Sequence, residues 1–144
     1  MGDLYSNCNK DLLEKCLIDS CKLAKLSRKS VDYIINLTSV SMNHYYFKEP
    51  SVIYKTLKGF SMGDNSAARG SEIILRIFEL KIFKKLQEQR LHKNVNRYLR
   101  FRDVPLHLTG NTETMLKIVK IITTGYPDAI QFNVETKIIY GVNF

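Results

Sequence analysis

The sequence predicts an α+β domain in which antiparallel strands pack against helices. Long stretches with apolar residues at helical spacing alternate with short segments rich in aromatic and β-branched residues. The short segments occur in pairs separated by turn residues, as expected for hairpins. No repeat, low-complexity tract or Pro/Gly-rich linker divides the chain, and 144 residues suffice for one buried core. We therefore expect a single domain over residues 1–144.

Two helices are predicted first. Apolar residues at helical spacing place one from Asn9 or Asp11 to about Leu26. Ser30 is a candidate cap for the second. The second helix would present these residues on one face: Val31, Ile34, Ile35, Thr38 and Met42. One helical face of each would then enter the core.

A hairpin and the longest helix follow. Residues 45–48 and 52–57 are rich in aromatic and β-branched types and flank the turn Glu49-Pro50-Ser51. Residues 59–65 then form a loop, and a helix is expected from Ser66 to about His92. Its apolar positions are Ile73, Ile74, Ile77, Phe78, Leu80, Phe83 and Leu86. This is the clearest helical pattern in the chain.

A second hairpin is expected after this helix. Residues 97–102 alternate as a strand, and Asp103-Val104-Pro105 breaks the pattern. Residues 106–108 can return antiparallel, with Pro105 confined to an edge or a turn.

The chain closes on one more helix and a hairpin. Thr112 is the expected cap of a helix that ends at Gly125, with a proline two residues beyond. Residues 130–135 and 138–142 alternate around a two-residue turn and predict a last hairpin.

Composition and charge limit the classes of partner and the cellular location that the sequence is expected to have. Apolar residues make up 44% of the chain and charged residues 25%, close to globular averages. No run of about 18 uncharged apolar residues occurs, so no membrane association is expected. Three cysteines without zinc-site spacing predict reduced thiols and an intracellular location. The three histidines show no metal-ligand spacing. A net charge of +8 favours a polyanionic partner such as nucleic acid.

Four segments, in chain order, carry a family resemblance. Residues 3–7, Asp-Leu-Tyr-Ser-Asn, resemble the tail of a motif F-D-x-x-S-L-Y-[ST]-N-I-P, and residues 59–67 resemble G-x-x-M-G-x-x-x-A. Residues 97–104 resemble R-Y…[YF]-x-D-D, and residues 126–144 resemble Y-P…I-x-F-x-x-E…V-x-F-L-D. In this order they are similar to reverse transcriptases of retrotransposons without long terminal repeats or of Penelope-like elements.

The resemblance implies a palm-like antiparallel sheet packed on helices and an RNA-directed DNA polymerase that uses Mg²⁺. Two-metal catalysis needs several carboxylates, and Asp103 matches the first aspartate of the x-D-D turn. Val104 stands at the second, and the remaining carboxylate would precede Met1. The metal site is therefore expected to be incomplete, the domain to be a truncated palm without activity of its own, and its uncovered apolar surface to promote self-association.

Other roles implied by the resemblance concern nucleotide and template. Tyr5 matches the aromatic residue beneath the nucleotide sugar, whereas Gly59, Met62 and Gly63 match the loop that supports the template. Structural alternatives exist, because Tyr5 can be a packing residue and the glycines can serve a tight loop. Asp103 can likewise be a turn residue that bonds its own backbone.

The densest basic region offers a nucleic-acid surface. Lys93, Arg97, Arg100 and Arg102 are its candidate backbone contacts, and strand alternation places Arg100 and Arg102 on the face of Tyr98. A solvated face is the alternative. Three hypotheses follow: an inactive polymerase relative, a non-catalytic nucleic-acid-binding protein, or a protein-interaction module whose charge is incidental.

Overall fold

The described part of the chain is mixed α+β and mostly helical, with two small antiparallel sheets. The structure is a computed structural model that describes residues 10–43, 46–55, 65–100, 104–128, 130, 132, 134 and 135. In chain order the elements are α2 (Lys10–Leu23), α3 (Arg28–Asn43), β1 (Tyr46–Glu49), β2 (Val52–Lys55), α4 (Asn65–Glu88), η1 (His92–Asn94), β3 (Val95–Tyr98), β4 (Leu106–Leu108) and α5 (Thr112–Gly125).

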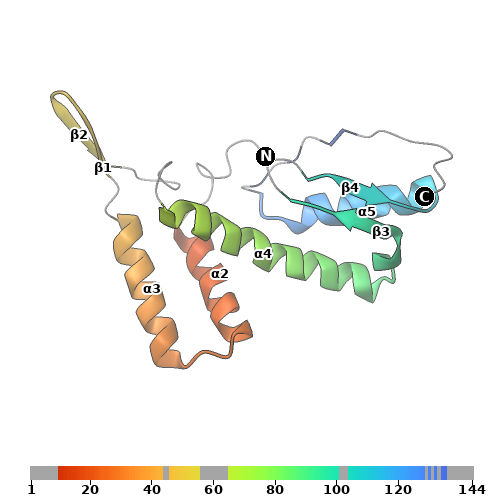
Figure 1. The fold of residues 1–144 in the computed structure, drawn as a ribbon, viewed down its shortest axis with the longest axis horizontal. Helices are drawn as coiled ribbons and strands as arrows, with labels where there is room; N and C mark the ends of the chain where they lie inside the picture. Colours follow the sequence, from red (N-terminus) through yellow and green to blue (C-terminus); the bar gives the residue numbers. More distant parts are fainter. Residues whose placement is uncertain are drawn as a thin grey trace.

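The long helix α4 forms the spine of the molecule (Figure 1). Helix α2 packs against its N-terminal part and α3 packs on α2, whereas α5 with the β3–β4 hairpin lies along its C-terminal part. The β1–β2 hairpin projects beyond the end of α3. Each sheet of the described residues has two strands, β1 with β2 and β3 with β4. The α+β class is thus confirmed, whereas one continuous palm-like sheet is not seen in the described part of the chain.

The core lies between α2, α4 and α5. Ile74 and Leu86 of α4 and Ile118 of α5 have no more than a trace of exposed surface. Burial of such side chains contributes about 1.5–3 kcal/mol each. The face predicted for α4 needs two corrections, because Leu80 is half exposed and Ile82 is buried. Ile82 joins the core because it packs against the end of α5.

The caps of two helices lie one or more residues before the predicted positions. Ser27, not Ser30, caps α3, since its Oγ accepts the backbone N–H of Ser30 at 3.2 Å. Asn111, not Thr112, caps α5, since its Oδ1 accepts the N–H of Thr114 at 2.8 Å. In both cases the capping side chain bonds the N–H three residues ahead, as this geometry requires.

Two helices end earlier than predicted, because a residue other than glycine adopts the left-handed conformation that terminates each of them. Lys25 after α2 and Arg90 after α4 have φ of 54° and 57°. After α4, the N–H of Leu91 donates to the carbonyl of Leu86 at 2.8 Å, and equivalent bonds close α2. This pattern is the Schellman motif, in which glycine is the usual left-handed residue. The sequence contains no glycine at either position, so these ends carried no recognisable signal.

Both described hairpins are found, but with shifted bounds. The strand predicted over residues 97–102 is Val95–Tyr98, and Glu49, predicted as a turn residue, is the last residue of β1. In β1–β2, Glu49 pairs with Val52 across a two-residue turn. The β3–β4 hairpin packs on α4 as predicted, with the Tyr98 ring edge-on to Phe83 at 5.1 Å between centroids. The predicted strand over residues 130–135 is not found at the described positions 130, 132, 134 and 135. Its partner, residues 138–142, lies outside the described residues.

Candidate nucleic-acid interface

An exposed basic segment runs from the last turns of α4 through η1 into β3. Its cations are Lys84, Lys85, Arg90, Lys93 and Arg97, which we call the basic segment. None of the five forms an ion pair with a carboxylate of the described residues. By contrast, Lys81, three residues before the segment begins, pairs with Asp19 of α2 at 2.9 Å. The segment therefore carries five cations against one carboxylate, Glu88, which forms none of the ion pairs of the described residues.

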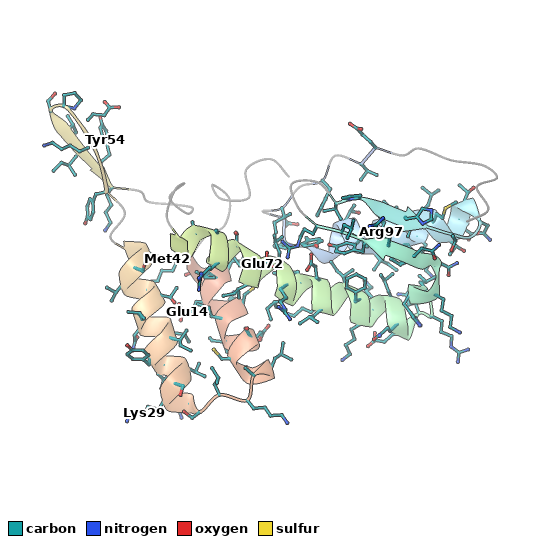
Figure 2. The ribbon with its side chains drawn as sticks, viewed as in Figure 1. Glu14, Lys29, Met42, Tyr54, Glu72 and Arg97 are labelled. Atoms are coloured by element: carbon teal, nitrogen blue, oxygen red, sulfur yellow. The ribbon has the colours of Figure 1, made fainter. Side chains whose placement is uncertain are left out.

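A β-bulge directs Arg97 to the outer face of the hairpin (Figure 2). Val95 and Arg97 pair with neighbouring residues of β4, which leaves Asn96 as the extra residue. The bulge lets Val95 and Tyr98 both face the core although they are three residues apart. Arg97 lies opposite His107, and both side chains are exposed. Simple alternation along the strand does not anticipate this arrangement.

Arg100, one of the predicted backbone contacts, is held by carboxylates of α4. Its guanidinium donates two hydrogen bonds to Glu72, at 2.9 and 2.6 Å, and its Nε donates to Glu79 at 2.6 Å. The Arg100 side chain is 16% exposed. Glu72 and Glu79 are seven residues apart, two helical turns, so both carboxylates lie on one face of α4. A phosphate contact by Arg100 would have to displace these bonds.

Glu79 is the centre of a polar cluster that joins three elements. Its carboxylate, 15% exposed, also accepts the Tyr98 hydroxyl at 2.9 Å and the Tyr126 hydroxyl at 3.3 Å. The two hydroxyl oxygens are 2.7 Å apart. We call Glu72, Glu79, Tyr98, Arg100 and Tyr126 the Glu79 cluster. It fastens the end of β3 and the end of α5 to the middle of α4.

The pKa values in the Glu79 cluster follow from burial and hydrogen bonding. Burial raises the pKa of Tyr98 to about 12, and burial together with the Tyr98 hydroxyl raises the pKa of Tyr126. The hydrogen bond from Arg100 lowers the pKa of Glu72, and the same bond raises the pKa of Arg100. The cluster therefore favours neutral tyrosines beside a charged guanidinium–carboxylate group.

Alkaline pH is expected to destabilise the fold through Tyr98. In the unfolded chain a tyrosine ionises near pH 10. The raised pKa of folded Tyr98 means that its contribution is complete below pH 10 and is lost as pH rises toward 12. Urea unfolding should therefore show a loss of about 2 kcal/mol from Tyr98 over this interval, which Tyr98→Phe removes, while the alkaline loss from Tyr126, whose pKa is also raised, remains. Tyr33→Phe, at an exposed tyrosine of α3, should retain the loss; equal alkaline losses in both variants would contradict the assignment.

The other residues implied by the family resemblance are not described by the structure. Tyr5, Gly59, Met62, Gly63, Arg102 and Asp103 all lie outside the described residues. Val104, where the resemblance implies a second metal-binding aspartate, has no side-chain oxygen for Mg²⁺. Among the described residues, no group of three His, Cys, Asp or Glu side chains is placed to hold a metal.

Two features were not found from the sequence. The hydrogen bonds of the Glu79 cluster join residues 19 to 47 positions apart, so its only sequence signal is a glutamate within an apolar helical face. The exposed side chains of β1–β2 also combine lysines with aromatic rings. Both depend on strand pairing and packing that residue spacing does not show.

Among the described residues, no helix is both long and apolar enough to cross a bilayer.

The comparisons with known proteins identify no relative of this chain. Protein-family models, curated protein sequences and solved structures were all compared with the chain, and none matches it.

Proposed function

We propose that the chain is a nucleic-acid-binding domain derived from a reverse-transcriptase palm and without polymerase activity of its own. The observation that carries the binding function is the basic segment, five exposed cations unpaired within the described residues. Clustered exposed cations release counterions from nucleic-acid phosphates, which drives sequence-independent binding. The overall charge of +8 acts in the same direction at longer range.

The arrangement of elements supports the kinship with polymerases. Helix α4 begins within residues 59–67, the segment that resembles the template-supporting motif, and β3 ends on Arg97-Tyr98 of the strand that resembles R-Y…[YF]-x-D-D. The hairpin packs on α4, as a sheet packed on helices requires, and α5 follows it in the chain. Val104, in place of an aspartate, supports the absence of catalysis, because Mg²⁺ needs oxygen ligands there.

Binding through the basic segment is expected to be weak, tolerant of sequence and strongly dependent on salt. Charge reversal by Lys93→Glu with Arg97→Glu should reduce affinity at least tenfold at about 0.1 M salt and lower the slope of log Kd against log salt by about two. The effect should be the same for oligonucleotides of unrelated sequence. Fluorescence anisotropy with labelled oligonucleotides measures both quantities.

The matched control is Arg28→Glu with Lys29→Glu. This pair has the same residue types and charge change, is exposed, and lies at the opposite end of the molecule from Arg97 (Figure 2). We expect it to weaken binding slightly, through net charge alone, with no change in the salt slope. Equal losses in the two double variants would show that the basic segment is not the contact surface.

A protein-interaction module is the second candidate, and one observation favours it. Tyr33, Leu37 and Val40 follow one another at helical spacing on α3 and are all more than half exposed. Exposed apolar residues on one helical face are typical of association surfaces. Binding of nucleic acid that does not change when salt is raised several-fold, together with self-association in sedimentation, would favour this candidate over the first.

A further inference from the structure

The β1–β2 hairpin presents a large exposed surface for its size. All four residues of β2 are exposed, as is Tyr46 at the start of β1. The hairpin projects from the end of α3, away from α4 (Figure 1). A two-stranded hairpin is marginally stable in water unless another surface packs against it. Side chains that remain exposed on such an element are therefore candidates for contact with a ligand.

The strand register separates the hairpin into two chemically different faces. Tyr46 pairs with Lys55, and Lys48 pairs with Ile53. Directly paired residues lie on the same face of an antiparallel sheet, and so do residues two apart along one strand. These four residues therefore form one surface, which we call the Tyr46 face. Glu49, the hairpin's acidic residue, belongs to the opposite face.

The Tyr46 face combines two ammonium groups with an aromatic ring. Tyr46 is 56% exposed and Ile53 is 67% exposed. Lys55 Nζ lies over one face of the Tyr46 ring, 5.9 Å from its centroid, so the cation and the ring are close enough to meet the same ligand. Lys48 lies two residues from Tyr46, about 6.7 Å along the strand. The face carries two positive charges and no negative charge.

This combination fits a single nucleic-acid strand. An exposed ring stacks on an unpaired base, and flanking cations pair with the phosphates on either side. In a duplex, the faces of the bases are already covered by neighbouring bases, so the ring would gain little. A peptide strand would gain from the apolar side chains but would meet two lysines without a counter-charge.

We infer that the Tyr46 face is a stacking platform for single-stranded nucleic acid, with Tyr46 against a base and Lys48 and Lys55 against phosphates. The inference rests on the proposed nucleic-acid-binding function and makes it specific for single strands. The basic segment contributes charge to any nucleic acid. The Tyr46 face adds an interaction that depends on an accessible base.

The test is anisotropy of labelled single strands of about 20 nucleotides, poly-dT and poly-U, and of a duplex of equal length, with the full chain. Tyr46→Ala should weaken single-strand binding about tenfold, as expected for the loss of one stacked base, without changing the salt slope. Tyr46→Phe should bind like the unmodified chain, because phenylalanine keeps the ring. Duplex affinity should stay within a factor of about two for both variants.

Tyr33→Ala serves as control because it removes an exposed tyrosine from α3 instead of the hairpin. Lys48→Gln with Lys55→Gln should weaken single-strand binding and lower the salt slope. If Tyr46→Ala binds like the unmodified chain while Lys93→Glu with Arg97→Glu loses binding, the platform is refuted and the proposed function stands. Equal losses of affinity for single strands and for the duplex in Tyr46→Ala would also refute the platform. If the unmodified chain binds neither single strands nor the duplex, the proposed nucleic-acid-binding function is refuted, and the platform with it.

Discussion

Replacing Arg100 with methionine is expected to lower the free energy of unfolding by about 3 kcal/mol. The substitution keeps the length of the side chain but leaves Glu79, 15% exposed, without its cation. The remaining partners of Glu79 are two tyrosine hydroxyls, which cannot neutralise a carboxylate. Glu72 contributes little to this loss, because its side chain is 56% exposed and water can hydrate its carboxylate once Arg100 is removed. Urea unfolding at neutral pH measures the difference.

Arg97→Met is the control for Arg100→Met, because it removes the same charge from the same hairpin. Arg97 is exposed and has no ion pair with a described carboxylate, so its loss should change stability by less than about 0.5 kcal/mol. Glu79→Gln in the Arg100→Met background should recover part of the loss by removing the unpaired charge. Equal effects of the two arginine substitutions would show that Arg100 does not stabilise the fold through the Glu79 cluster.

Replacing Gly125 with valine is expected to cost about 3 kcal/mol by overpacking. Gly125 is the last residue of α5, and a Cβ there would overlap Cγ1 and Cδ1 of Ile82. Ile82 is buried in the core and cannot move away freely. The end of α5 would have to separate from α4, which would also draw Tyr126 away from Glu79.

Thermal unfolding of Gly125→Val should be compared with Thr124→Val at the preceding, exposed position. The control loses one hydroxyl hydrogen bond to Lys120 and should cost no more than about 1 kcal/mol. Gly125→Ala combined with Ile82→Ala should be less destabilised than the sum of the single variants, because one change removes the atoms that the other would strike. Additive losses would contradict close packing of these residues.

The elements with strong local patterns were predictable, and their ends were not. Helix α4 was found from its apolar spacing, and both described hairpins were found from their turns. The ends of α2 and α4 depend on Lys25 and Arg90 in left-handed conformation, which their residue types disfavour. The predicted strand over residues 130–135 alternates correctly, but Ile130 and Phe132 instead pack against the core without strand pairing.

The candidate site was predictable where it depends on charge and not where it depends on contacts. The basic segment follows from the density of lysine and arginine along the chain. The different environments of Arg97 and Arg100 could not be predicted from this density. They depend on the bulge at Asn96, which exposes Arg97, and on two glutamates of α4, which bind Arg100. Alternation correctly placed Tyr98 and Arg100 together, since both reach Glu79. The glutamate that they share is 19 residues or more away in sequence and had no local signal.

We propose that the chain binds nucleic acid without polymerising it, and primer extension separates these two activities. A primed RNA template should be supplied with nucleotides and Mg²⁺, at protein concentrations that saturate its binding. We predict a bound template that is not extended, by the unmodified chain or by Val104→Asp. One turn's carboxylates cannot secure two ions about 3.5–4 Å apart without a ligand from elsewhere. Mg²⁺-dependent extension by the unmodified chain would show that it is an active polymerase.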